Sequence, residues 1–96
     1  MHSADLIGKF IYIFRGGDGR DYLNDLHTLN TITNTWKLVV AEEDCPPPRA
    51  NHCSAVVKNK LFIFGGWDGV KRLNDLFAFD TETNTWQEVI DYKVKM

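Results

Sequence analysis

The sequence has little of what several large protein classes depend on. It contains only two cysteines and three prolines in 96 residues, and its charges nearly balance, with 11 lysines and arginines against 13 aspartates and glutamates. Because the two signs are interspersed, a surface for nucleic acid or for an anionic membrane is not expected. The two cysteines fit neither a C-x-x-C motif nor a zinc-ligand spacing. We therefore expect free thiols, with no metal and no other cofactor.

Long apolar runs are also missing. The longest uninterrupted run of strongly apolar residues, Phe10 to Phe14, is far shorter than the roughly 20 residues that cross a bilayer. The first residues lack the basic and apolar regions of a secretory signal, so a cytoplasmic location is the expectation. A chain of 96 residues forms at most one small domain.

What the chain does have is an internal repeat at an offset of 50 residues. A unit of this size is typical of one supersecondary element in an array. We therefore divide the chain into a first repeat over residues 1–45 and a second over 46–96. The clearest matches are Ile13-Phe14 with Ile63-Phe64, Asp18-Gly19 with Asp68-Gly69, Leu23–Leu26 with Leu73–Leu76, and Thr33–Trp36 with Thr83–Trp86.

Each repeat has the pattern of four β-strands. The aromatic and β-branched runs Phe10–Phe14 and Leu61–Phe64 predict interior strands that are covered on both faces. Each run leads into a glycine pair, where a positive φ or a close backbone approach can end the strand. No stretch shows a sustained helical period, so we predict an all-β fold of two four-stranded antiparallel units. The other expected strands begin at Asp25 and Asp75, carry Trp36 and Trp86, and include Ser54–Val57, with hairpin turns at 30–34 and 80–84.

A unit of about 50 residues, with paired glycines ending its second strand and a tryptophan on its fourth, resembles the kelch repeat, which forms one blade of a β-propeller. The second copy matches the pattern better, through His52, Leu61–Gly66, Asp68-Gly69, Leu73–Asp75 and Trp86.

The first copy departs from this pattern at two positions. Arg15 stands where the pattern has its first glycine. Asp5 would place a carboxylate in an innermost strand, which is costly without a partner. Either that strand is frayed, or Asp5 faces the solvent channel of a propeller.

Two blades cannot close a propeller, because closed propellers typically have about 4 to 8. The chain is therefore expected to be part of a longer kelch protein, or a protomer that completes a ring with further copies of itself. Three copies would supply six blades. The repeated tryptophans Trp36 and Trp86 are expected to pack between neighbouring blades, and Asp25 and Asp75 to cap or tie down loops.

Function in such a scaffold is expected in the loops, where the two copies differ. Trp67 follows the second glycine pair at the position of Gly17, in a loop that, by resemblance, lines the binding face of kelch propellers. A loop tryptophan is a plausible anchor for a partner. Arg49 either binds a partner's carboxylate or bonds backbone within the connection between blades. The predicted partner-binding residues are Trp67, Asp68, Lys71, Arg49, Ala50, Asn51, Arg15 and Arg20.

No catalytic motif is present: the sequence lacks a G-x-S-x-G elbow, a P-loop, a G-x-G-x-x-G and an H-E-x-x-H. We therefore predict a non-enzymatic protein-interaction module with no catalytic, cofactor-binding or metal residues. The resemblance implies a substrate adaptor of a ubiquitin ligase, an actin-associated scaffold or an effector of small GTPases. The alternatives are a fragment of a propeller enzyme whose catalytic residues lie in other blades, and a self-assembling ring protomer.

Overall fold

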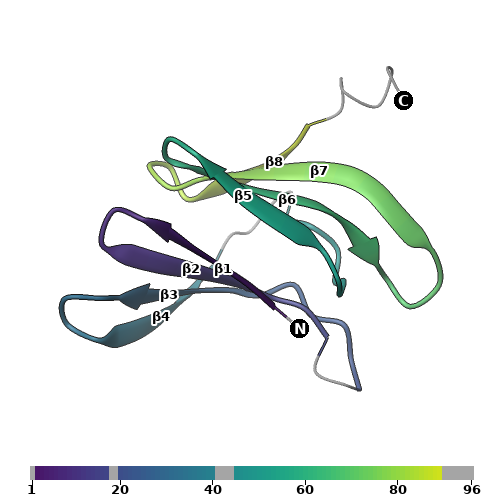
Figure 1. Cartoon of the computed structure of the whole chain (residues 1–96), viewed down its shortest axis with the longest axis horizontal. Coiled ribbons are helices and arrows are strands. Elements are labelled where there is room, and N and C mark those ends of the chain that lie inside the picture. Colours follow the sequence, from purple (N-terminus) through teal and green to yellow (C-terminus); the bar gives the residue numbers. More distant parts are fainter. Residues whose placement is uncertain (1, 18–19, 41–44, 90–96) are drawn as a thin grey trace.

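The structure, a computed structural model, describes residues 2–17, 20–40 and 45–89 (Figure 1). Its strands form two four-stranded antiparallel sheets, each paired in chain order. This confirms the predicted all-β fold class. Sheet 1 contains β1 (His2–Ile7), β2 (Phe10–Arg15), β3 (Leu26–Asn30) and β4 (Thr35–Val39), and sheet 2 contains β5 (Cys53–Val57), β6 (Lys60–Trp67), β7 (Arg72–Asp80) and β8 (Thr85–Glu88).

The hairpin turns between the third and fourth strands are built alike in both sheets. Asn30 Oδ1 accepts hydrogen bonds from the backbone N–H of Ile32 at 3.0 Å and of Thr33 at 3.2 Å. In sheet 2, Asp80 Oδ1 accepts the equivalent bond from Glu82 at 2.9 Å. Short polar side chains that bond their own backbone fix a tight turn, as the repeated sequence predicts.

The core lies between the two sheets. Figure 1 shows them one against the other, with β1 and β5 adjacent. The ring of Phe14 meets Trp86 edge-on, with centroids 5.8 Å apart. Both belong to one buried cluster, so Trp86 packs between the sheets as expected. Its other members are Tyr12, Leu26, Leu61, Ile63, Phe77 and Phe79.

The innermost strand of sheet 1 is neither frayed nor left with an unpaired carboxylate. β1 pairs with β2 from His2 to Ile7. Asp5 is half-buried on the side of β1 that meets sheet 2, where its Oδ2 accepts a hydrogen bond of 2.7 Å from Ser54 Oγ. The neighbouring sheet therefore supplies the polar partner, and the two expectations raised for Asp5 are replaced by this contact.

The two sheets differ where their glycine pairs stand. Gly65 and Gly66 have φ values of 66° and 110°, and the β6–β7 register shifts there, so β7 begins at Arg72, earlier than the predicted Asp75. Arg15 occupies the position of Gly65 but has no positive φ, and β2 ends there. A side chain disfavours a positive φ, and the continuous strand ends at Arg15. Gly17 nevertheless pairs with Tyr22, at the position of the Trp67–Arg72 pair, so the one-residue register shift is present in both sheets.

Candidate functional site

The connection between the sheets is hydrogen-bonded to both of them. The backbone N–H of Arg49 donates to the carbonyl oxygen of Leu23, in the loop between β2 and β3, at 3.2 Å. Ala50 and Trp67 exchange two backbone hydrogen bonds of 2.9 and 2.8 Å. The connection therefore runs as a short extra strand between the loop of sheet 1 and the end of β6.

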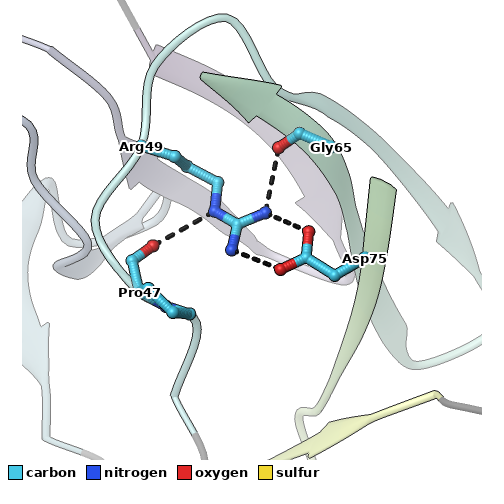
Figure 2. Close-up of polar contacts among 4 residues, drawn as sticks. All are labelled: Pro47, Arg49, Gly65 and Asp75. Atoms are coloured by element: carbon cyan, nitrogen blue, oxygen red, sulfur yellow. Dashed lines mark hydrogen bonds and ion pairs between the residues drawn. The ribbon is translucent and has the colours of Figure 1, made fainter. Parts of the chain in front are cut away.

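Arg49 is fully buried in this connection and holds it to sheet 2 (Figure 2). Its Nη1 and Nη2 donate to the two carboxylate oxygens of Asp75 at 2.5 and 2.8 Å. Nη1 also donates to the carbonyl oxygen of Gly65 at 2.9 Å, and Nε to that of Pro47 at 3.1 Å. A planar guanidinium is suited to such a bidentate pair because its donors lie in a fixed fork.

This geometry corrects the predicted site at two positions. Arg49 and Ala50 both lie inside the fold, so neither side chain offers a surface to a partner. The carboxylate that Arg49 binds belongs to Asp75 of the same chain, 26 residues away. Asp75 thus ties down the connection, as expected of it, and both Arg49 and Ala50 are removed from the candidate site.

The candidate site is an open hollow of about 610 Å³ beside the end of β6. Trp67, half-buried, and Asn51, exposed, both line it, which brings together two of the predicted residues. Arg72 lines it as well, because it pairs with Trp67 across the β6–β7 hairpin. Gly66 and Leu73 complete its lining.

Asp68 and Lys71 belong to the hairpin loop at this hollow. Asp68 Oδ1 accepts hydrogen bonds from the backbone N–H groups of Lys71 and Val70, each at 2.8 Å. These bonds hold the pKa of the Asp68 carboxyl below its usual value. Asp68 therefore shapes the loop, whereas the side chains of Lys71 and Val70 are exposed.

Tyr22 is a site residue that sequence reasoning missed. Its ring lies against Gly69, where an added Cβ atom would be only 3.0 Å from Tyr22 Cε2. Tyr22 comes from sheet 1 and Gly69 from sheet 2, so the loops of the two sheets touch. The signal was available, because Tyr22 stands at the position of Arg72 in the repeat and the two residues differ.

Arg15 lies away from the hollow at Trp67. It lines a second hollow of about 460 Å³, with His27 and Trp36, on sheet 1. Its Nη1 is 3.3 Å from Asp25 Oδ2, and the same oxygen contacts His27 Nε2 at 2.5 Å. Burial acts to raise the pKa of Asp25, but the hydrogen bond with His27 and the charge of Arg15 hold it below its ordinary value. Arg20 is exposed in the loop before Tyr22.

Comparison with known families accounts for this repeated architecture. A family model described as the KLHDC2/KLHL20/DRC7 Kelch-repeats domain matches residues 1–95. The chain belongs to the kelch-repeat family. Each sheet is therefore a kelch blade, and the segment holding Arg49 connects two consecutive blades.

Several curated proteins are similar to this kelch chain over part of its length. It is 46% identical over 55 residues to acyl-CoA-binding domain-containing protein 5 of Arabidopsis thaliana, which is 56% of this chain and 8% of that protein. It is 37% identical over 60 residues to Rho GTPase-activating protein gacHH of Dictyostelium discoideum, which is 62% of this chain and 4% of that protein. Kelch domain-containing protein 3 of Rattus norvegicus is also 37% identical over 60 residues, covering 60% of this chain and 16% of the relative.

Membership fixes the general kind of function. Kelch repeats typically act as protein-interaction scaffolds, bind protein partners and are generally non-catalytic. In the three ranges that the structure describes, no group of three histidine, cysteine, aspartate or glutamate side chains is placed to hold a metal ion. The same ranges contain no helix long and apolar enough to span a membrane.

His52 lies at the junction of the two kelch blades. Its ring meets that of Phe14 edge-on, with centroids 5.0 Å apart, and its Nε2 is 2.9 Å from Ser3 Oγ. Its Nδ1 is buried with no hydrogen-bond partner among the described residues. Burial lowers the pKa of His52, the positive charges of Arg49 and His2 lower it further, and Asp5 acts in the opposite direction. The blade junction therefore favours the neutral ring.

This predicts a loss of stability in mild acid. The pKa of His52 is lower in the folded chain than in the unfolded one, where the pKa of histidine is about 6.5. The stabilising contribution is thus complete above about pH 6.5 and is lost as the pH falls through the folded pKa. The urea concentration at the midpoint of unfolding should decrease as the pH is lowered from neutral to about 5. His52→Gln should make this dependence of the midpoint on pH weaker. An equal dependence in His52→Gln would contradict this assignment.

Proposed function

We propose that this chain is a non-enzymatic protein-binding segment of a kelch propeller, and that it holds its partner at the loop face. The loop face is the surface formed by Asn51, Trp67, Lys71, Arg72 and Tyr22. The observation that carries the proposal is the hollow at Trp67, which an indole, an amide and a guanidinium line together. It supports binding because an apolar group beside a few convergent polar groups is the usual composition of a recognition site.

The chemistry of the loop face indicates what a partner would present. A half-buried tryptophan offers apolar area at little entropic cost, and it is a frequent hot-spot residue. Arg72 and the nearby Lys71 are exposed and positively charged, whereas the carboxylate of Asp68 is engaged by its own loop. The best fit is therefore a protein segment that places an apolar side chain on Trp67 and a carboxylate near Arg72.

The class of partner is part of this proposal. The family resemblance favours a ubiquitin-ligase substrate, actin or a small GTPase. The name of the Dictyostelium relative describes a GTPase-activating protein, and those of the plant relatives describe acyl-CoA-binding domains. Since the matched stretch is 4–8% of those proteins, these names support a kelch segment that serves proteins of different kinds.

Trp67→Ala is expected to weaken partner binding by at least about tenfold, because truncating a hot-spot anchor typically costs about 2 kcal/mol or more. Ligand peptides can be selected from a display library on the wild-type chain alone, without counter-selection. The selected peptide is then titrated by calorimetry against the wild-type, Trp67→Ala and Arg72→Ala chains.

Val70→Ala is the matched control, since Val70 is exposed in the same loop but does not line the hollow. Its affinity should equal that of the wild type. The loop face is the wrong site if folded Trp67→Ala and Arg72→Ala chains bind the peptide as tightly as the wild type does.

A further inference from the structure

His52 joins the junction of the two sheets to the hollow at Trp67. Its ring lies in the junction, edge-on to Phe14, whereas Asn51, the residue before it, lines the hollow. The backbone of His52 packs closely on Gly66, because a Cβ atom added to this glycine would lie 3.2 Å from the nitrogen and 3.3 Å from the Cα of His52. Gly66 also lines the hollow. A displacement of His52 would therefore reach the hollow directly.

The segment 50–52 has little freedom to absorb such a displacement. Ala50 is held at one end by its two backbone hydrogen bonds with Trp67. Asn51 has a φ of 60°, a left-handed conformation that few residues other than glycine adopt. At the other end, the residue after His52 begins β5. Movement of His52 is therefore passed to Asn51 and, through Ala50, to Trp67.

The junction accommodates the neutral ring of His52 but not the charged one. A protonated imidazole has two N–H donors and therefore needs two acceptors. Ser3 Oγ, 2.9 Å from Nε2, serves one of them. Nδ1 is buried and has no hydrogen-bond partner among the described residues. Protonation in place would thus leave a buried, charged donor unpaired, which is costly.

The charges around His52 favour a displaced ring once it is protonated. Burial lowers the pKa of His52, and the positive charges of Arg49, in the connection, and His2, on β1, act in the same direction. Asp5, also on β1, attracts a positive charge at this position. One of its oxygens already accepts a hydrogen bond from β5, but an ionised carboxylate can accept several. A protonated ring therefore gains by leaving Ser3 and turning toward Asp5.

We propose that protonation of His52 switches the loop face, so that it holds its partner near neutral pH and releases it in mild acid. This inference rests on the proposed function, because it assigns a regulation to the same site. In the closed state the neutral ring lies beside Ser3, and Asn51 and Trp67 line the hollow. In the open state the ring turns toward Asp5, and the segment 50–52 loosens from Trp67. A partner that binds the closed state better acquires an affinity that depends on pH.

The test titrates the ring of His52 by nuclear magnetic resonance, in the full chain with and without the peptide selected on the wild type. Binding and protonation are linked reciprocally, so the bound peptide should lower the pKa of His52. The chain with neutral His52 should bind the peptide about fivefold or more tightly than the protonated chain, the usual size of a coupling between sites. Calorimetry at several pH values measures this ratio.

Two variants of the same kind separate His52 from the other histidines. His52→Gln keeps a side-chain N–H for Ser3 but does not titrate, so its affinity for the peptide should not change with pH. His27→Gln is the matched control, because His27 lines the second hollow on sheet 1 and is absent from the hollow at Trp67. It should keep the pH dependence of the wild type. Equal pH dependence in the two variants contradicts the proposal.

The outcomes distinguish this switch from the proposed function. A peptide that requires Trp67 but leaves the pKa of His52 unchanged overturns the switch alone. A peptide that binds folded Trp67→Ala as tightly as the wild type overturns the proposed function, and the free wild-type chain then decides on the switch.

In the free chain, protection from amide exchange at Ala50 and Trp67 should fall as His52 is protonated. Protection should persist at Thr81, whose N–H donates to the carbonyl oxygen of Asn59 at the other end of sheet 2. Equal loss at all three amides would indicate global unfolding and overturn the switch, as would unchanged protection at Ala50 and Trp67. Neither this measurement nor the titration of His52 requires a variant, so both stand if His52→Gln fails to fold.

Discussion

Arg49→Met is expected to lower the free energy of unfolding by about 3–5 kcal/mol, the usual effect of removing one partner of a buried ion pair. The substitution leaves the carboxylate of Asp75, only 15% exposed, without its bidentate partner. It also removes the donors to the carbonyl oxygens of Gly65 and Pro47. Because small domains have total stabilities of about 5–15 kcal/mol, the variant should be close to unfolding at room temperature. Urea denaturation followed by circular dichroism measures this loss.

Arg15→Met is the matched control within the same chain. The pair of Arg15 and Asp25 has the side chains 45% and 29% exposed and a single contact at 3.3 Å. Exposed pairs contribute at most about 1 kcal/mol, so this variant should be nearly as stable as the wild type. Equal losses in the two variants would show that burial of Arg49 has no special role.

A second substitution separates an unpaired charge from a lost contact. If the cost of Arg49→Met comes mainly from the isolated carboxylate, adding Asp75→Leu should restore part of the stability, since uncharged replacements of buried pairs are often well tolerated. A double variant less stable than Arg49→Met alone would instead assign the loss to the hydrogen bonds of the connection.

The strands and turns of this fold follow from local patterns, and they could therefore be predicted. The aromatic and β-branched run Phe10–Phe14 and the polar turn residues around Asn30 act over a few residues, and the repeat doubles each signal. The role of Arg49 was not decidable in this way. Its carboxylate partner, Asp75, lies 26 residues away in the sequence. Whether Arg49 binds Asp75 or a carboxylate of a partner protein depends on how the connection packs against β7, which a local pattern does not contain.

Burial was the other property that the sequence could not settle. Trp36 and Trp86 stand in the same Thr-Asn-Thr-Trp motif, but only Trp86 is covered. The difference comes from the neighbouring sheet, which places Phe14 over one tryptophan and nothing equivalent over the other in the described chain. Likewise, Tyr22 joins the loop face only because the loop of sheet 2 passes beside it. Such contacts are set by tertiary packing, which a local pattern does not contain.

Gly66→Ala is expected to destabilise the chain by about 2–6 kcal/mol, from two causes that act together. The φ of Gly66 is 110°, a conformation whose strain costs a residue with a side chain roughly 1–3 kcal/mol. An added Cβ would also lie 2.6 Å from the carbonyl oxygen of Ala50 and 3.2 Å from the backbone nitrogen of His52. Overpacking of this kind costs about 1–3 kcal/mol, and here the obstructing atoms are backbone that cannot rotate away.

Gly8→Ala isolates the conformational part of this effect. Gly8 has a φ of 62°, but an added Cβ would meet no atom within 4 Å, so its loss should stay near the roughly 1–2 kcal/mol cost of a left-handed residue. Amide exchange at Ala50 and Trp67 provides the local measurement, because the clash pushes apart the two backbone groups that exchange hydrogen bonds there. Exchange should accelerate at both amides in Gly66→Ala and remain unchanged in Gly8→Ala. Equal stability losses with unchanged exchange would show that the connection does not depend on the close approach at Gly66. A larger stability loss in Gly66→Ala than in Gly8→Ala, with faster exchange at both amides, would mean that this glycine, with Arg49, holds the connection against the second blade and sets the position of Trp67.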